Sequence, residues 1–128
     1  MVLTETLSQN IVIASYKYAG MQFDWKTFNC VHFVRKVYAE FGIILPLLSH
    51  DTLPPREFHL SLDEFMRMPL GHSVFFKRKA SMVHRSWTHV AIIIAPHALI
   101  HNTRHLGTGV VITPVTEFLE TYVLSSCT

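Results

Sequence analysis

Cys30 is the residue of this chain best suited to nucleophilic chemistry. It follows Asn29, a residue type favoured as a helix N-cap, and precedes apolar residues at helical spacing, so it should occupy the first position of a helix. There the helix dipole and the unsatisfied backbone N–H groups stabilise a thiolate and lower the thiol pKa. The same N–H groups could hold a developing oxyanion. Taken alone, a buried cysteine is more often structural than reactive.

A cysteine nucleophile needs a base, and histidine is the usual one. The chain has nine histidines, so their positions must discriminate among them. His89 begins the most apolar predicted strand, and His101 lies on the next strand, across a predicted hairpin turn at Pro96-His97. Counting outward from the turn puts the two about opposite each other, close enough for one imidazole to orient the other. Without Cys30, the simpler interpretation is two histidines on the polar face of a sheet.

Helices are expected in the first half of the chain. One should cover residues 4–19, with Thr4 as N-cap and Gly20 as its end, and the helix of Cys30 should run from Asn29 to Gly42. The capping box of residues 61–64 should begin a short third helix that ends before Pro69. Residues 43–60 contain three prolines and no sustained period, which predicts a loop.

Short runs rich in Val, Ile and Phe follow from residue 73 onward. They predict five strands, at 73–77, 88–95, 98–103, 109–113 and 122–125. Helices first and strands afterwards, joined by short turns, predict an α+β fold whose N-terminal helices pack on a five-stranded antiparallel sheet. A length of 128 residues fits a single domain over residues 1–128.

Four segments resemble the motifs of the NlpC-type cysteine peptidases. Residues 28–46 resemble the nucleophile helix of that family, and residues 71–76 resemble its first strand. Residues 88–93 and 99–102 resemble the strands that carry its histidine and its third catalytic residue, in the same order and spacing. The resemblance implies a papain-like α+β fold and hydrolysis of peptide bonds in the stem peptides of bacterial peptidoglycan, often next to D-glutamate. It implies no metal or other cofactor.

The resemblance also implies roles for individual residues. Cys30 would be the nucleophile, His89 the general base and His101 the orienting residue. The family usually reads Asp-Cys-Ser-Gly, where this chain has Asn29-Cys30-Val31-His32. Phe23 stands where the family tends to carry a tyrosine that assists near the oxyanion. Either the backbone N–H of Cys30 suffices for the oxyanion, or Trp25 or another group substitutes for that tyrosine.

The remaining candidates surround these positions. Because Asn29 is neutral and Val31 apolar, we expect weaker anchoring of a free amino terminus than in the family, unless Asp24 binds it. His32 should be structural or pocket-lining, because residues i and i+2 of a helix do not share a face. The candidates for contacts to the substrate or its oxyanion are Asn29, Phe23, Asp24, Trp25, Trp87 and Thr88.

Three other interpretations of the sequence stand beside the peptidase. The string Asn-Cys-x-His-Phe-Val is similar to the lecithin retinol acyltransferase relatives, thiol acyltransferases or lipid-amide hydrolases, whose mark here would be an apolar mouth at residues 43–48. In those proteins the histidine precedes the cysteine, the reverse of this chain. Histidines at 84, 89, 101 and 105 could converge on a metal, but no His-x-x-x-His with a helical Glu occurs, and a structural zinc site usually uses paired cysteines. Phe23 mildly favours an inactive module that binds wall peptide, whereas the three retained triad positions oppose it.

Composition excludes several classes of protein. Charged residues are 16% and hydrophobic residues 49% of the chain, which excludes intrinsic disorder. A net charge of +2 and one short basic run, Lys77-Arg78-Lys79, do not indicate a nucleic-acid partner. The longest apolar run, 90–95, is too short for a membrane span.

The cysteine content and the first residues indicate where the protein works. Two cysteines do not make a disulfide framework, and Cys127 is interpreted as an incidental thiol near the terminus. No basic residue precedes Lys17, so the charged region of a signal peptide is missing. We therefore expect a protein that is cytoplasmic at synthesis, one exported by a signal-free route such as a phage tail or a secretion system, or one that has lost its leader.

Overall fold

The computed structural model describes residues 3–44, 61–79 and 87–124. Its elements are, in chain order, α1 (Glu5–Tyr16), α2 (Cys30–Ala39), α3 (Leu62–Met66), β1 (Ser73–Arg78), β2 (His89–Ala95), β3 (Ala98–Thr103), β4 (Gly109–Pro114), α4 (Val115–Thr121) and β5 (Tyr122–Leu124). The strands form one antiparallel sheet in the order β4-β3-β2-β1-β5. This confirms the predicted α+β fold with a five-stranded antiparallel sheet.

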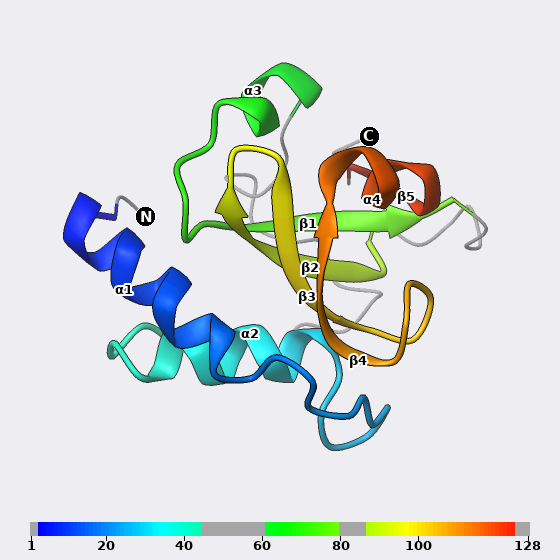
Figure 1. Ribbon diagram of the computed structural model, residues 1–128, viewed down its shortest axis with the longest axis horizontal. Helices are drawn as coiled ribbons and strands as arrows, with labels where there is room; N and C mark the ends of the chain where they lie inside the picture. Colours follow the sequence, from blue (N-terminus) through cyan, green and yellow to red (C-terminus); the bar gives the residue numbers. More distant parts are fainter. Residues whose placement is uncertain (1–2, 45–60, 80–86, 125–128) are drawn as a thin grey trace.

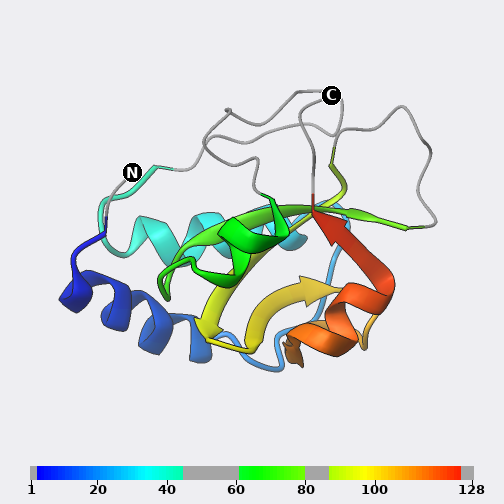
Figure 2. The same cartoon turned by 90° about the horizontal axis from the view of Figure 1, so that it is seen from above.

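Helices pack on both faces of the sheet. Figure 1 shows α1 and α2 together on one side of the strands and α3 and α4 on the other, and Figure 2 gives the same arrangement from above. Successive side chains of β2 point to opposite faces of the sheet. Val90 and Ile92 pack toward α1 and α2, whereas Ala91 and Ile93 pack toward α3 and α4. Burial on both faces explains why β2 is the most apolar run of the sequence.

The chain between α1 and α2 is fastened to the edge of the sheet. The helix α1 has the expected N-cap, Thr4, but ends at Tyr16, and the chain continues to Ala19 in turns closed by i→i−3 hydrogen bonds. Gly20 then donates to the carbonyl of Val110, and Val110 donates to the carbonyl of Met21, both at 2.9 Å. At Gly109 (φ +107°) a Cβ atom would lie 2.2 Å from the Met21 carbonyl oxygen. Glycine is therefore required for this close approach.

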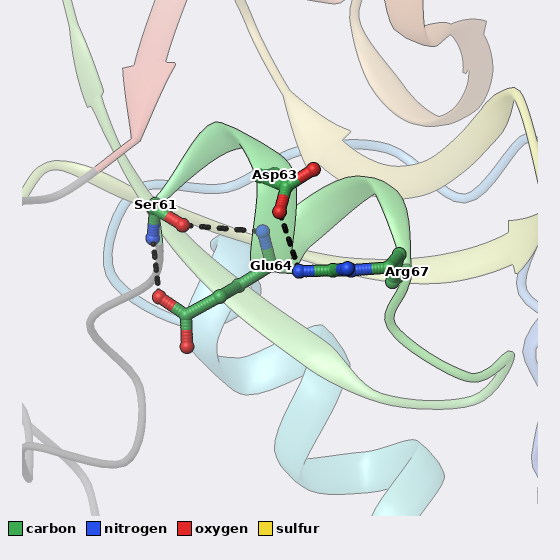
Figure 3. A network of polar contacts seen from close by, with 4 residues as sticks. All are labelled: Ser61, Asp63, Glu64 and Arg67. Atoms are coloured by element: carbon green, nitrogen blue, oxygen red, sulfur yellow. Dashed lines mark hydrogen bonds and ion pairs between the residues drawn. The ribbon is translucent and has the colours of Figure 1, made fainter.

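The short helix α3 begins with the predicted capping box (Figure 3). The hydroxyl of Ser61 accepts from the backbone N–H of Glu64, while the Glu64 carboxylate accepts from the backbone N–H of Ser61. Asp63 and Arg67 form an ion pair one turn apart. Most of the loop predicted at 43–60, residues 45–60, lies outside the described residues.

The sequence pattern predicts no helix between the fourth and fifth strands, and there the prediction is wrong. The structure places α4 at this point, with Val115 and Phe118 buried in the core of the second face. A helix of seven residues is too short to be stable by its own propensity, and its N-cap, Pro114, offers no side-chain hydrogen bond. Its stability comes from tertiary packing, which residue spacing over so short a segment does not reveal.

Candidate active site

Cys30 occupies the first position of α2, as the sequence predicts. The side-chain oxygen of Asn29 accepts from the backbone N–H groups of Val31 and His32, at 3.0 and 3.2 Å. In return, Nδ1 of His32 accepts from the backbone N–H of Asn29 at 3.1 Å, so a histidine completes a capping box that usually uses Glu or Gln. Asn29 is thus confirmed as the N-cap, and His32 has the structural role expected of it.

A buried asparagine ties the start of α2 to the sheet. Asn102 follows His101 in β3, and its Nδ2 donates to the carbonyl oxygens of Phe28 and Asn29, at 2.7 and 3.2 Å. This pair of hydrogen bonds fixes the turn before Cys30 relative to the strands that carry His89 and His101. Our sequence reasoning missed Asn102, although an amide inside an otherwise apolar strand is a signal that could have been used.

The thiol of Cys30 is buried against β2. Burial raises its pKa to about 11, while hydrogen bonds from the backbone N–H groups of Val90, Val31 and Cys30 lower it. The backbone N–H groups at the helix start thus lower the thiol pKa, as expected. The prediction that the thiol pKa lies below its ordinary value is nevertheless wrong, because desolvation outweighs these donors. At neutral pH Cys30 is therefore a thiol and not a thiolate.

His89 and His101 are joined side chain to side chain. Nε2 of His89 lies 2.7 Å from Nδ1 of His101, and Nε2 of His101 lies 2.8 Å from the hydroxyl oxygen of Thr113 in β4. The strand register does not place the two histidines opposite each other. Ile92 of β2 pairs with Ile100 of β3, so the same register places Ala91, and not His89, opposite His101. The two imidazoles therefore meet along a diagonal of one face of the sheet.

This chain of three side chains allows two proton arrangements. In the first, Nε2–H of His89 donates to His101, and Nε2–H of His101 donates to Thr113, which leaves Nδ1 of His89 able to take a proton. The second reverses both hydrogen bonds and puts a proton on Nδ1 of His89. Only the first suits a general base. Burial lowers the pKa of His101 to about 3, so this residue stays neutral near neutral pH.

Aromatic side chains enclose the two histidines. The ring of Tyr122, at the start of β5, stacks on His89 with centroids 4.5 Å apart and 15° between the planes. Phe118 of α4 also stacks on Tyr122, with 25° between the planes, and packs edge to face with His101. Neither aromatic was a candidate from the sequence, because the helix that carries Phe118 and turns the chain to Tyr122 was not predicted.

Three other candidates lie in the loop that leads to Cys30. Asp24 accepts from the backbone N–H groups of Thr27 and Lys26, and these hydrogen bonds hold the pKa of its exposed carboxyl below the usual value. Trp25 is exposed, and its carbonyl accepts from Nδ2 of Asn29 at 3.1 Å. The guanidinium carbon of Arg104 lies 5.1 Å from the ring centre of Trp25 and 5.8 Å from that of Phe23.

The last two candidates precede His89 and are part of the framework. Trp87 is fully buried and packs edge to face on Phe75, with ring centres 5.0 Å apart. Thr88 bridges β1 and β2, since its hydroxyl accepts from the backbone N–H of Arg78 at 2.7 Å. Both residues help to set where β2 begins, and hence where His89 lies.

The structure bears in part on the metal-site and acyltransferase alternatives. In residues 3–44, 61–79 and 87–124, no three side chains of His, Cys, Asp or Glu are placed to hold a metal ion. His84, residues 45–48 of the proposed apolar mouth, and Cys127 lie outside the described residues. Within the described part of the chain, no helix is long and apolar enough to cross a membrane.

Two solved structures share the fold. A protein from Staphylococcus aureus subsp. aureus Mu50, described as similar to a lipoprotein of the NLP/P60 family, matches with a TM-score of 0.70 and 18% identity, over 100% of this chain and 44% of that one. An NlpC/P60 family protein from Bacillus cereus ATCC 10987 matches with a TM-score of 0.67 and 19% identity, over 94% of this chain and 39% of that one. This chain thus spans less than half the length of either protein.

Comparison at the level of sequence families agrees with these structural matches. A search of curated proteins gave no match. The sequence model of the NlpC/P60 family matches residues 14–125, a range that includes Cys30, both histidines and Tyr122. That family has a cell-wall peptidase type of function, and its members are generally cysteine peptidases. The chain belongs to the NlpC/P60 family.

Proposed function

We propose that the chain is a cysteine peptidase that hydrolyses amide bonds in the stem peptides of bacterial peptidoglycan, with Cys30 as nucleophile, His89 as general base and His101 as orienting residue. The observation that carries the proposal is the convergence of three elements on one point. The N-terminus of α2 presents Cys30 to the backbone of β2 at Val90, directly after His89. His89 is held in turn by His101 of β3.

The chemistry follows from the protonation states. The Cys30 sulfur forms a bond to the carbonyl carbon of the scissile amide as its proton passes to Nδ1 of His89, and the backbone N–H of Cys30 stabilises the oxyanion. The imidazolium then gives this proton to the departing amine, leaving a thioester. Water attacks the thioester, its proton passes to His89, and the acid and the free thiol are released.

Burial shapes this mechanism. Because Cys30 and His101 are both buried in uncharged form, the only charge separation expected is the one made during attack, between the sulfur and His89. Low solvent access strengthens the hydrogen bonds that support this transient pair. If this attack limits the rate, the rate should therefore depend on every group that stabilises the thiolate and the imidazolium together.

The test is digestion of purified peptidoglycan, followed by mass spectrometry of the released fragments. We expect the wild type to release stem-peptide fragments with new amino and carboxyl ends, Cys30→Ala to release none, and the matched control Cys127→Ser to behave as wild type. If Cys30→Ala still binds peptidoglycan and neither this variant nor the wild type cleaves it, the chain is an inactive binding module. Acyl transfer to added amine or lipid without hydrolysis would favour the acyltransferase instead.

A further inference from the structure

An arginine lies over two aromatic rings that belong to the loop before α2. The guanidinium carbon of Arg104, in the loop between β3 and β4, is 5.1 Å from the ring centre of Trp25 and 5.8 Å from that of Phe23. A cation–π contact holds the guanidinium in place and requires none of its five N–H donors. Arg104 and Trp25 are both exposed, so these donors are accessible to a ligand from solvent.

Hydrogen bonds tie both sides of this contact to the residue before Cys30. The carbonyl of Trp25 accepts from Nδ2 of Asn29 at 3.1 Å. From the sheet, Asn102 donates to the carbonyl of Asn29 at 3.2 Å, and Arg104 follows two residues later. An extended peptide advances roughly 3.3 Å per residue. A peptide bound at Cys30 can therefore reach Arg104 with a group only a few residues from the scissile bond.

The protein itself does not neutralise the charge of Arg104. Among the residues that the structure describes, the carboxylates in ion pairs belong to Glu40 and Asp63, and each pairs with a cation other than Arg104. The carboxyl of Asp24 accepts from two backbone N–H groups of its own turn. Burial lowers the pKa of His105, and positive charges, that of Arg104 among them, lower it further. This edge of the molecule therefore favours an anion from outside the chain.

We propose that Arg104 binds a carboxylate of the peptide substrate and so makes the candidate active site selective for acidic peptides. A guanidinium offers paired N–H donors whose spacing matches the two oxygens of a carboxylate. Because Phe23 and Trp25 already hold the guanidinium, less conformational entropy is lost when the carboxylate binds. These two aromatic residues, expected from the sequence to contact the substrate or its oxyanion, act here as the support of a binding residue. The inference rests on the proposed function, since it assumes that a peptide binds at Cys30.

The experiment measures peptide binding to the Cys30→Ala protein, which should not cleave the peptide, by isothermal titration calorimetry. The probes are a purified stem tetrapeptide with free carboxyl groups and the same peptide with these groups converted to carboxamides. We expect the free acid to bind about tenfold more tightly than the amide form, as one charge-assisted contact predicts. Arg104→Gln should abolish this preference by weakening the binding of the free acid alone. Arg104→Lys keeps the charge without the paired donors and should retain part of the preference.

The matched control is Arg67→Gln. Arg67 is also exposed, but it follows α3 and pairs with Asp63. This variant should bind both peptides as the Cys30→Ala parent does. Trp25→Leu removes one supporting ring and should reduce the preference for the free acid. An unchanged preference in Arg104→Gln would overturn the inference, and so would equal weakening of both peptides in that variant or the same loss of preference in Arg67→Gln.

The outcome is separable from that of the proposed function, since binding is measured without cleavage. A preference for the free acid that depends on Arg104, together with no cleavage of peptidoglycan by the wild type, would support the inference and reject the proposed function. Cleavage that depends on Cys30, with equal binding of the two peptides, would do the reverse. If neither peptide binds and the wild type does not cleave peptidoglycan, both are rejected.

Discussion

Nε2 of His89 and Nδ1 of His101 are 2.7 Å apart, and their rings meet nearly at right angles, with 82° between the planes. The strand register continues to Ala91 opposite His101, so the contact spans a diagonal of the sheet. Diagonal neighbours are farther apart than direct partners, and only a long side chain closes the gap. The contact therefore depends on the full reach of two imidazoles, each held by packing.

Removing either histidine should lower activity, but not equally. We expect His89→Ala to lose about 10³-fold or more in kcat/KM, because general base catalysis is lost. His101→Ala should lose about 10²-fold, because His89 keeps its basic nitrogen but loses its orientation. Kinetics of fragment release from peptidoglycan check both values, with His97→Ala, an exposed residue in the β2–β3 turn, as control. Wild-type kinetics for His89→Ala would refute the mechanism.

The hydroxyl of Thr113 should matter through His101. Thr113→Val keeps the shape of the side chain but leaves Nε2 of the buried His101 without this partner, so we expect a loss of about 1–2 kcal/mol in the free energy of unfolding. Activity should fall several-fold, since His101 no longer prefers the tautomer that leaves His89 basic. Thr113→Ser should restore both properties, and chemical denaturation with parallel kinetics measures them. Activity in Thr113→Val equal to that in Thr113→Ser would contradict the proton arrangement argued for here.

Loss of the Asn102 amide should loosen the nucleophile. In Asn102→Ala the carbonyls of Phe28 and Asn29 lose their donor, and we expect a destabilisation of about 2 kcal/mol. The rate of Cys30-dependent hydrolysis should fall beyond what the folded fraction explains, measured well below the unfolding temperature. The control is Asn10→Ala, at an exposed position of α1. If activity per folded molecule stays unchanged, Asn102 has a purely structural role.

Stability should decrease as the pH falls below about 6.5. Burial holds the pKa of His101 at about 3 in the folded protein, against an ordinary value of 6.5, so over this window the unfolded chain binds one more proton at this residue. The unfolding free energy should therefore fall by about 1.4 kcal/mol per pH unit from this group. Burial also lowers the pKa of His72 and His105, which adds to the same trend.

Urea denaturation between about pH 7 and pH 4.5 measures that slope. His101→Gln removes the titrating group, so its unfolding free energy should change less with pH than that of the wild type. A slope that His101→Gln leaves unchanged would show that this histidine binds a proton equally well in both states.

A free amino terminus on the stem peptide should matter little for cleavage. Both ends of the Asn29 amide are engaged: the oxygen caps α2, and Nδ2 donates to the carbonyl of Trp25. The carboxyl of Asp24 is committed to its own turn. We therefore expect kcat/KM for a free stem peptide and its N-acetylated form to agree within a few-fold, as measured by chromatography of the products. A strong preference for the free amine would mean that another group binds it.

Local signals in the sequence determined where the reactive residues lie along the chain. An N-cap asparagine and an apolar face of helical period placed Cys30 at the start of α2, because capping depends on neighbouring residues alone. The same holds for the capping box of α3 and for most strand bounds. Residue spacing could not predict α4, because a single turn or two of helix owes its stability to the core it covers.

Only the tertiary structure decided the properties that arise from contacts between distant segments. Thr113 reaches His101, Asn102 reaches the carbonyls before Cys30, and Tyr122 reaches His89, because strand order and register bring these residues together. Burial of the thiol likewise reversed the pKa shift that the helix start by itself predicts. Desolvation depends on everything packed around a group, so the sequence placed Cys30 at the helix start while the fold decided the protonation state of its thiol.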